Sequence, residues 1–267
     1  MSLNIVNIGI KTLELDEWIS YAINQLKIKP ADTETRFQLI ELYILKADWE
    51  RALQQLNTIY KISSESQKQV ELLRNLILSE NLRQQVLNGS REARSLEKCL
   101  PEWSIMLQQA NASYGRGDYS KGEDLRAYAM ELAPENPGSC DAFSSFNWLS
   151  DGDDRLGPIC EFIYAGGYRW IPFMEINALV IEQPKTLMDI VWAKAIITLD
   201  KPIHGFIPAR YLVNQEDEQY VKAGLSTNWQ EQEKGRFICK GRKMWATSAG
   251  ECSLFEAGKI NFDVVEK

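Results

Sequence analysis

The feature that most constrains the fold is the segment Pro134-Glu135-Asn136-Pro137-Gly138, where one hydrophobic period gives way to another. Two prolines and a glycine within five residues cannot continue a helix, because proline lacks an amide hydrogen and its ring clashes with the preceding turn. Before this segment apolar residues recur at helical spacing, and after it they alternate or form short runs. We therefore predict two domains, a helical domain over 1–138 and an α+β domain over 139–267.

Two sets of large side chains show the helical spacing most clearly. They are Trp49, Leu53, Leu56 and Tyr60, and Trp103, Leu107, Ala110 and Tyr114. Steps of three and four residues place each set on one face of a helix, so we expect both faces to pack into a core. Asp32, Asp48 and Asp118 each precede a helical run and are expected to cap it. A long helix over 67–88 ends at Asn88-Gly89, and Pro101 opens the next one.

Two motifs in this half resemble tetratricopeptide repeats. Ala47-Asp48-Trp49-Glu50-Arg51-Ala52-Leu53 and Gly117-Asp118-Tyr119-Ser120-Lys121-Gly122 lie 70 residues apart, about twice the period of roughly 34 residues of that repeat. The second motif has the small residues Ala110, Gly122 and Ala129 and then Pro134 at the expected spacing, whereas Ser64 replaces the proline of the first. We predict an N-terminal TPR-like α-α superhelix of about six helices.

The second half carries the signals of an antiparallel sheet. Residues 159–164 and 168–173, separated by Ala165-Gly166-Gly167, predict a β-hairpin. Further strands are expected over 178–182, 191–199, 236–239, 243–247 and 261–265, with a short helix over 216–223. Five of the eight tryptophans, Trp148, Trp170, Trp192, Trp229 and Trp245, fall here and are expected to supply much of the core. The expected fold is an α+β domain with a strongly bent antiparallel sheet.

Composition and charge exclude several function classes. A formal net charge of -7 argues against binding to a phosphate backbone. The apolar runs are too short to span a bilayer and the first residues lack signal-peptide character, so we expect a cytoplasmic protein. Five scattered cysteines without a C-x-x-C pair, and His204 as the one histidine, predict reduced thiols, no metal site and no cofactor.

Candidate catalytic groups are sparse. Ser150 and Cys160 have no base near them in the sequence, and neither a G-x-S-x-G motif nor a phosphate loop occurs. We interpret His204 as a turn or packing residue. A hydrolase in the second half would have to use Asp151, Asp153, Arg155 and His204, and this enzyme alternative is the weaker one.

The run Phe146-Asn147-Trp148-Leu149-Ser150-Asp151-Gly152-Asp153-Asp154-Arg155-Leu156-Gly157-Pro158 resembles the signature of the ImpE/TagJ family. Later segments agree with it in order: Gly167-Tyr168-Arg169-Trp170-Ile171-Pro172-Phe173, Leu187-Met188-Asp189-Ile190-Val191-Trp192 and Ile207-Pro208-Ala209-Arg210-Tyr211. Physically, Asp151-Gly152 favours a tight turn, and Asp153 and Asp154 can pair with Arg155. An EF-hand is excluded, because Leu156 and Phe162 stand where it needs glycine and glutamate.

The resemblance implies a non-catalytic accessory protein of the type VI secretion system. It implies binding to the N-terminal helix of the small sheath subunit TssB and a role linked to sheath disassembly by the ATPase ClpV. The residues that we single out, as partner-binding or structural signature positions, are Trp148, Asp151, Asp153, Arg155, Tyr168, Trp170 and Arg210. A repeat adaptor unrelated to secretion is the alternative. Stacked helices offer a concave face for a partner helix, so we favour the helical half as the binding region.

Overall fold

The computed structural model describes residues 15–96, 99–232 and 236–263. Six helices come first in the chain: α1 (Leu15–Ile28), α2 (Thr33–Leu45), α3 (Trp49–Ile62), α4 (Gln67–Leu87), α5 (Glu102–Gly115) and α6 (Tyr119–Leu132). The strands begin after them, at Gly138. The change from helix to strand therefore falls at the proline-rich segment, as predicted. In the described residues, no helix is both long and apolar enough to cross a membrane.

The predicted helix boundaries are confirmed by their capping groups. The Asp32 carboxylate accepts hydrogen bonds from the amides of Glu34 and Thr35, at 3.1 and 3.3 Å. Asp48 and Asp118 cap α3 and α6 in the same way. These caps satisfy amides that the first turn of a helix leaves free. Just after the C-terminal end of α4, Gly89 has a φ of 75°, the left-handed conformation in which many helices end.

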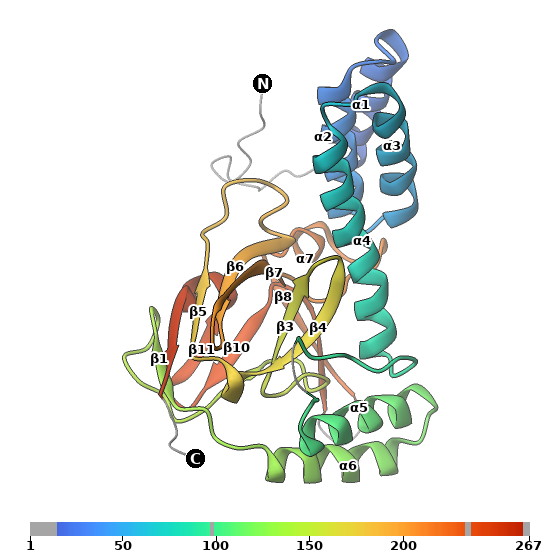
Figure 1. Cartoon of the computed structure of the whole chain (residues 1–267). Coiled ribbons are helices and arrows are strands. Elements are labelled where there is room, and N and C mark those ends of the chain that lie inside the picture. Colours follow the sequence, from blue (N-terminus) through green and yellow to red (C-terminus); the bar gives the residue numbers. More distant parts are fainter. Residues whose placement is uncertain (1–14, 97–98, 233–235, 264–267) are drawn as a thin grey trace.

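The helices form two groups rather than one continuous stack. α1, α2 and α3 pack beside the first part of α4, whose second part runs down along the strands (Figure 1). α5 and α6 form a hairpin at the opposite end of the molecule. The six helices and their order agree with the prediction, whereas the TPR-like superhelix stays an interpretation of the sequence motifs.

Strands build the second half, and every pair of neighbouring strands is antiparallel. A seven-stranded sheet has the order β1 (Gly138–Cys140), β12 (Lys259–Phe262), β5 (Ala178–Ile181), β6 (Trp192–Thr198), β7 (Pro202–Pro208), β3 (Ile159–Tyr164) and β4 (Gly167–Pro172). A second sheet has the order β11 (Gly250–Ser253), β10 (Met244–Thr247) and β2 (Leu149–Asp151), and β8 (Thr227–Glu231) pairs with β9 (Phe237–Gly241). Short helices are η1 (Phe173–Glu175), α7 (Gln219–Lys222) and α8 (Leu254–Ala257). An α+β arrangement is confirmed, and the strong bend of the sheet stays a prediction.

The predicted hairpin is β3 and β4, joined by Ala165 and Gly166 with φ angles of 48° and 71°. Two successive positive φ angles are typical of the two-residue turn that matches the twist of the strands. Strand β7 was not predicted, because Pro202 and Pro208 lie at its two ends. Proline is tolerated at the first position of a strand, so the interpretation of His204 as a turn residue is wrong and the residue lies within β7.

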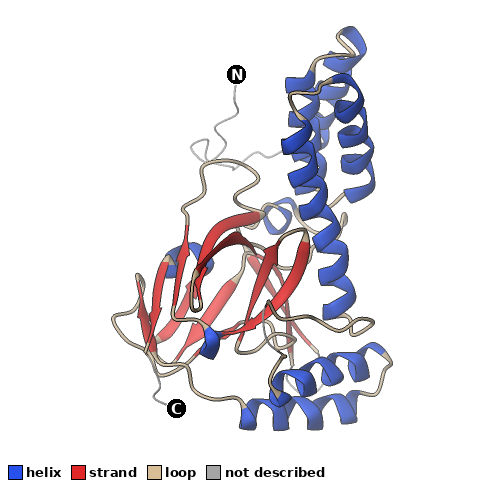
Figure 2. Cartoon of the chain, viewed as in Figure 1, coloured by secondary structure: helices blue, strands red, loops and turns tan. Residues whose placement is uncertain are grey.

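The buried apolar side chains form two clusters. The first contains Leu39, Ile77 and Leu107 of the helices together with Ile159 and Trp170 of the strands. The second lies within the strand region. The helices and the seven-stranded sheet therefore share a core, as the contact of α4 with β4 also indicates (Figure 2). Division into domains at residue 138 stays a prediction.

The expectation for the five tryptophans is wrong in two cases. Trp170, Trp192 and Trp245 are buried, but Trp148 and Trp229 are each 41% exposed. Trp148 immediately precedes β2 at a sheet end, and Trp229 lies on the two-stranded ribbon. Aromatic content identifies a core, but not which rings the edge strands leave accessible. Tyr60 likewise leaves the predicted core face of α3 and is 42% exposed.

Candidate functional site

A buried cluster of charges lies where α4 meets the strands, and Glu161 of β3 is at its centre. Arg83 of α4 donates from Nε to Glu161 Oε1 at 2.7 Å and from Nη2 to Oε2 at 2.9 Å. Lys243, between β9 and β10, lies 2.7 Å from the same Oε2. All three side chains are at most 1% exposed. One carboxylate thus holds two cations from distant segments of the chain.

The signature residue Asp151 extends this cluster from β2. Lys243 Nζ donates to Asp151 Oδ2 at 2.6 Å, and the Tyr211 hydroxyl donates to Oδ1 at 2.9 Å. The lysine therefore bridges Asp151 and Glu161. Asp151 was predicted to make a tight turn; its carboxylate does accept the Asp153 amide at 2.9 Å, but it also serves as the buried partner of a cation.

Tyr168 and Trp170 join the cluster from β4. The Tyr168 hydroxyl donates to Glu161 Oε1 at 2.6 Å, and Trp170 Nε1 donates to the Tyr168 oxygen at 2.8 Å. On the helix side, Glu80 Oε2 accepts from Arg83 at 3.2 Å and Glu80 Oε1 accepts from Trp192 Nε1 at 2.8 Å. Each polar group in this interior thus has a partner, which burial requires.

Electrostatics favour the charged forms of Glu161 and Lys243. Burial opposes the charge of Glu161, but Arg83 and Lys243 outweigh it and hold the pKa of that carboxyl well below its usual range. Burial likewise opposes the charge of Lys243, yet Asp151 and Glu161 raise the pKa of its ammonium. A buried ion pair that is well bonded is costly to break by removing one partner, because the other charge is left alone in a low dielectric.

Asp153 and Arg155 form a second pair, as predicted. The guanidinium donates from Nε and Nη2 to the two carboxylate oxygens at 2.8 and 2.6 Å. Asp153 also accepts the amide of Cys239 at 3.0 Å, which attaches the signature turn to β9. Asp154 does not pair with Arg155; it lies 3.5 Å from Arg126 of α6 and accepts the Phe237 amide. The turn therefore connects α6 and β9.

Arg210, the last of the chosen positions, closes the end of α2. Its guanidinium donates to the carbonyl oxygens of Ile44 and Leu45 at 2.7 and 2.8 Å, and to the carbonyl of Lys222 at the end of α7. Burial lowers the pKa of Arg210 to about 10, so it stays charged at neutral pH. A cation at the C-terminal ends of two helices also complements their dipoles.

Five of the seven chosen positions are thus buried, Arg155 is partly buried, and Trp148 is the exposed one. Arg83 and Glu80 complete the network and were missed in the sequence. A signal was present: they continue the stripe of Leu73, Leu76 and Leu87 on α4 at steps of three and four residues. Charged residues on an otherwise apolar helix face indicate buried pairs.

The geometry gives no catalytic arrangement for the enzyme alternative. Asp151, Asp153 and Arg155 are occupied in the pairs above, whereas His204 is exposed on β7. Cys160 is buried, and burial raises the pKa of its thiol above the ordinary value. Over the described ranges, no group of three or more histidine, cysteine or carboxylate side chains could hold a metal ion.

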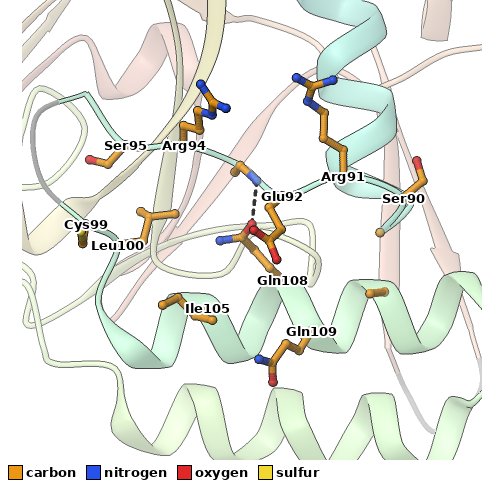
Figure 3. A pocket seen from close by; sticks show the side chains of 13 residues that line it. Ser90, Arg91, Glu92, Arg94, Ser95, Cys99, Leu100, Ile105, Gln108 and Gln109 are labelled. Carbon is orange, nitrogen blue, oxygen red and sulfur yellow. Dashed lines mark hydrogen bonds between the residues drawn. The ribbon is translucent and has the colours of Figure 1, made fainter.

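Two cavities do not bring free polar groups together into a site. One, of about 590 Å³, lies between the segment after α4 and α5 (Figure 3). Glu92 extends toward Gln108 there, whereas Arg91 and Arg94 extend away from α5, so their charges do not converge. The other, of about 560 Å³, has Glu80, Arg155 and Arg210 in its lining. Each of these three is already bonded within the protein.

A third cavity is an apolar groove of about 810 Å³ between α1 and α2. We call it the α1–α2 groove; it is lined by Glu17, Trp18, Tyr21 and Ala22 of α1, by Glu34, Phe37, Gln38, Glu41 and Leu42 of α2, and by Lys185, Thr186 and Leu187. The last three belong to the loop between β5 and β6, which rises from the sheet toward these helices (Figure 1). Aromatic and aliphatic walls with a few charges are typical of a surface that binds a partner.

Comparison with known proteins agrees with this arrangement. Residues 144–261 match the family model described as ImpE protein. The chain is 29% identical over 252 residues to the type VI secretion system accessory component TagJ of Pseudomonas aeruginosa, covering 93% of this chain and 88% of that protein. The chain thus resembles the ImpE family over residues 144–261 and TagJ over most of its length. The crystal structure of protein VPA1032 from Vibrio parahaemolyticus is similar with a TM-score of 0.86 and 25% identity, over 94% of this chain and 95% of that one.

The matched region of the ImpE family contains all seven chosen positions, from Trp148 to Arg210. It does not contain α1 or α2, which supply most of the α1–α2 groove. The sequence segments that resemble the family therefore contain residues of the buried network, whereas the groove can be recognised only in the folded structure. Arg210 connects the two, because it bonds the carbonyl end of α2.

Proposed function

We propose that this protein belongs to the ImpE/TagJ family and is a non-catalytic, cytoplasmic accessory component of the type VI secretion system. In this proposal it binds the N-terminal helix of the small sheath subunit TssB and acts in sheath disassembly by ClpV. The relative from Pseudomonas aeruginosa, which is named as an accessory component of that system, matches along most of both chains and supports the proposal.

The observation that carries the binding role is the α1–α2 groove. From Glu34 to Leu42 the wall formed by α2 spans eight residue steps, which is about 12 Å at 1.5 Å per residue. That length suits about two turns of a docked helix. Trp18, Phe37 and Leu42 supply an apolar floor for side chains at helical spacing. No reacting group is needed for such a function.

We further propose a structural role for the signature. Arg83, Glu161, Lys243 and Asp151 tie α4 to β3 and β2, and Arg210 ties α2 to α7. These bonds keep the two helices of the groove in a fixed position relative to the loop over 185–187. A rigid groove binds without the entropic cost of ordering its walls.

The test is calorimetry with a peptide that corresponds to the N-terminal helix of the cognate TssB and the intact protein. We expect saturable one-to-one binding, lost when the apolar anchors of the peptide are replaced by serine. Absence of heat and of competition at about millimolar peptide, where a free energy near 4 kcal/mol would register, would contradict the proposal.

A further inference from the structure

We infer that the α1–α2 groove selects a basic amphipathic helix, whose apolar residues lie against Trp18 and Phe37 and whose lysine or arginine pairs with Glu41. The inference rests on the proposed function for the identity of the partner, but its chemistry is tested separately. It specifies which helices the groove accepts and which residues of this chain make the choice.

Helix α1 supplies large apolar side chains to the groove. Trp18 and Tyr21 line the groove, and Tyr21 is 67% exposed. Ile28, seven residues after Tyr21 and therefore on the same helix face, is 73% exposed. Large apolar side chains at this exposure continue the groove as a stripe along α1. A stripe on one helix is complementary to a stripe on another.

The described charged side chains that line the groove are mostly acidic. Among the lining residues that the structure describes, three glutamates, Glu17, Glu34 and Glu41, face one lysine, Lys185, and there is no arginine. The groove thus has more acidic than basic groups, so it favours a partner helix that flanks its apolar stripe with cations. Complementary charge selects the right partner and speeds its association.

Glu41 is the most specific of these groups. It is half-buried, and among the described residues no cation or hydrogen-bond donor pairs with its carboxylate. The neighbouring charges are Glu34 of the same helix, Glu17 of α1, and Lys185 and Asp189 of the loop between β5 and β6. Asp189 is itself 3.5 Å from Lys194 of β6. Among the described residues, Asp189 is the acidic group whose charge raises the pKa of Glu41. A cation from a docked helix would therefore give Glu41 a partner that the described residues do not supply.

Burial and the charge of Asp189 together raise the pKa of Glu41 to about 7. Near neutral pH the carboxyl is then partly protonated in the free protein. Pairing with a cation favours the ionised form, so docking should release a fraction of a proton. This release distinguishes contact with Glu41 from general attraction to an acidic surface.

The experiment uses the full chain and three probes of equal length. One is an amphipathic leucine peptide flanked by lysines, the second carries glutamates in place of the lysines, and the third is the TssB peptide. We expect the basic peptide to bind at least 10-fold more tightly than the acidic one. At pH 7 its binding enthalpy should depend on the ionisation enthalpy of the buffer, and Glu41→Gln should abolish that dependence.

Two surface variants locate the site. Tyr21→Lys places a cation on the groove wall at a side chain that is already exposed, and we expect it to weaken basic-peptide binding at least 10-fold. Tyr60→Lys, on α3 and 42% exposed, is the matched control and should bind normally. Circular dichroism and thermal unfolding verify that both variants fold.

The outcomes separate this inference from the proposed function. TssB binding that is unchanged in both Tyr21→Lys and Glu41→Gln would overturn the groove inference and leave the proposed function standing. If the TssB peptide does not bind but the basic peptide binds tightly and depends on Glu41, the proposed function would be overturned and the groove inference would stand. Equal affinity for the acidic peptide would overturn the inference. So would a dimer in sedimentation that Tyr21→Lys converts to monomer, because a second copy would then occupy the groove.

Discussion

Arg83 of α4 and Glu161 of β3 lie 78 residues apart in the chain and meet in a bidentate ion pair with neither side chain more than 1% exposed. Parallel bonds from one guanidinium to one carboxylate fix direction as well as distance. The pair therefore sets how α4 lies on the sheet. The helices α1–α3 pack beside the first part of α4. The orientation of α4 therefore also determines on which side of the molecule the α1–α2 groove lies.

Removal of the cation should be strongly destabilising. Arg83→Met keeps most of the aliphatic volume but leaves Glu161 and Glu80 short of a partner in the interior. We expect a loss of about 3–5 kcal/mol in the free energy of unfolding, measured by denaturant titration. Arg91→Met, at an exposed arginine just beyond α4, is the control and should change it by less than about 0.5 kcal/mol. A loss below about 1 kcal/mol in Arg83→Met would show that the network is not stabilising as a unit.

Stability should depend on pH through Glu161. Its pKa in the folded protein lies below the value of about 4.3 that glutamate has in an unfolded chain. A lowered pKa contributes stability above the unfolded value, and that stability is lost as the pH falls toward the folded value. The difference in unfolding free energy between the natural protein and Glu161→Gln should thus be constant above about pH 5 and narrow below about pH 4. A difference that is flat from pH 5 to 3 would contradict the assignment.

The sequence predicted local structure better than the site. Caps such as Asp32 and Asp48 and the turn at Ala165-Gly166 depend on neighbours in the chain, so their residue types revealed them. Pairing of Arg83 with Glu161 depends on how a helix crosses a sheet, which no local spacing encodes. The pair of Asp153 with Arg155 was predictable because the two residues are only two positions apart in the chain. Lys243 was not, since 92 residues separate it from Asp151.

The groove was beyond the sequence for a related reason. Trp18 and Phe37 look like ordinary core residues of amphipathic helices, and both do pack against the first core cluster. The groove that they line also needs the loop over 185–187, far along the chain. No sequence motif marks Glu41. Its unusual pKa follows from burial beside Asp189, and thus from the folded arrangement alone.

A packing prediction concerns Gly205 in β7. A methyl group added there would approach Phe162 Cζ to 2.4 Å and the Ile163 carbonyl oxygen to 2.6 Å. Because the backbone oxygen cannot move without disturbing the pair of β3 and β7, Gly205→Ala should cost about 1–3 kcal/mol. His204→Ala, at the exposed neighbour on the same strand, should cost less than about 0.5 kcal/mol. Thermal unfolding of both variants would measure the difference, and equal melting temperatures would rule out the close contact.

Substitution of Trp148 and of Trp170 should distinguish signature residues that stabilise the fold from those that lie at the surface. Trp170 is fully buried, so Trp170→Ala should lower the free energy of unfolding by about 3–5 kcal/mol. Trp148 is 41% exposed, and Trp148→Ala should cost less than about 1 kcal/mol. Chemical denaturation measures both. If Trp148→Ala instead abolishes binding of the TssB peptide without unfolding the protein, the partner surface would include the signature segment.

The last prediction concerns the two regions predicted to be domains. Ile77 of α4 and Leu107 of α5 share one buried cluster with Ile159 and Trp170 of the strands. The segment between the regions is also fixed: the Asn136 side chain is 4% exposed, accepts the Leu149 amide at 2.6 Å and donates to its carbonyl oxygen at 3.1 Å. Because such contacts are lost cooperatively, the intact chain should show one unfolding transition. Tryptophan fluorescence and circular dichroism should both report that transition at the same denaturant concentration. Two separated transitions, or rapid proteolysis at residues 134–138 that releases two stable fragments, would establish independent domains over 1–138 and 139–267.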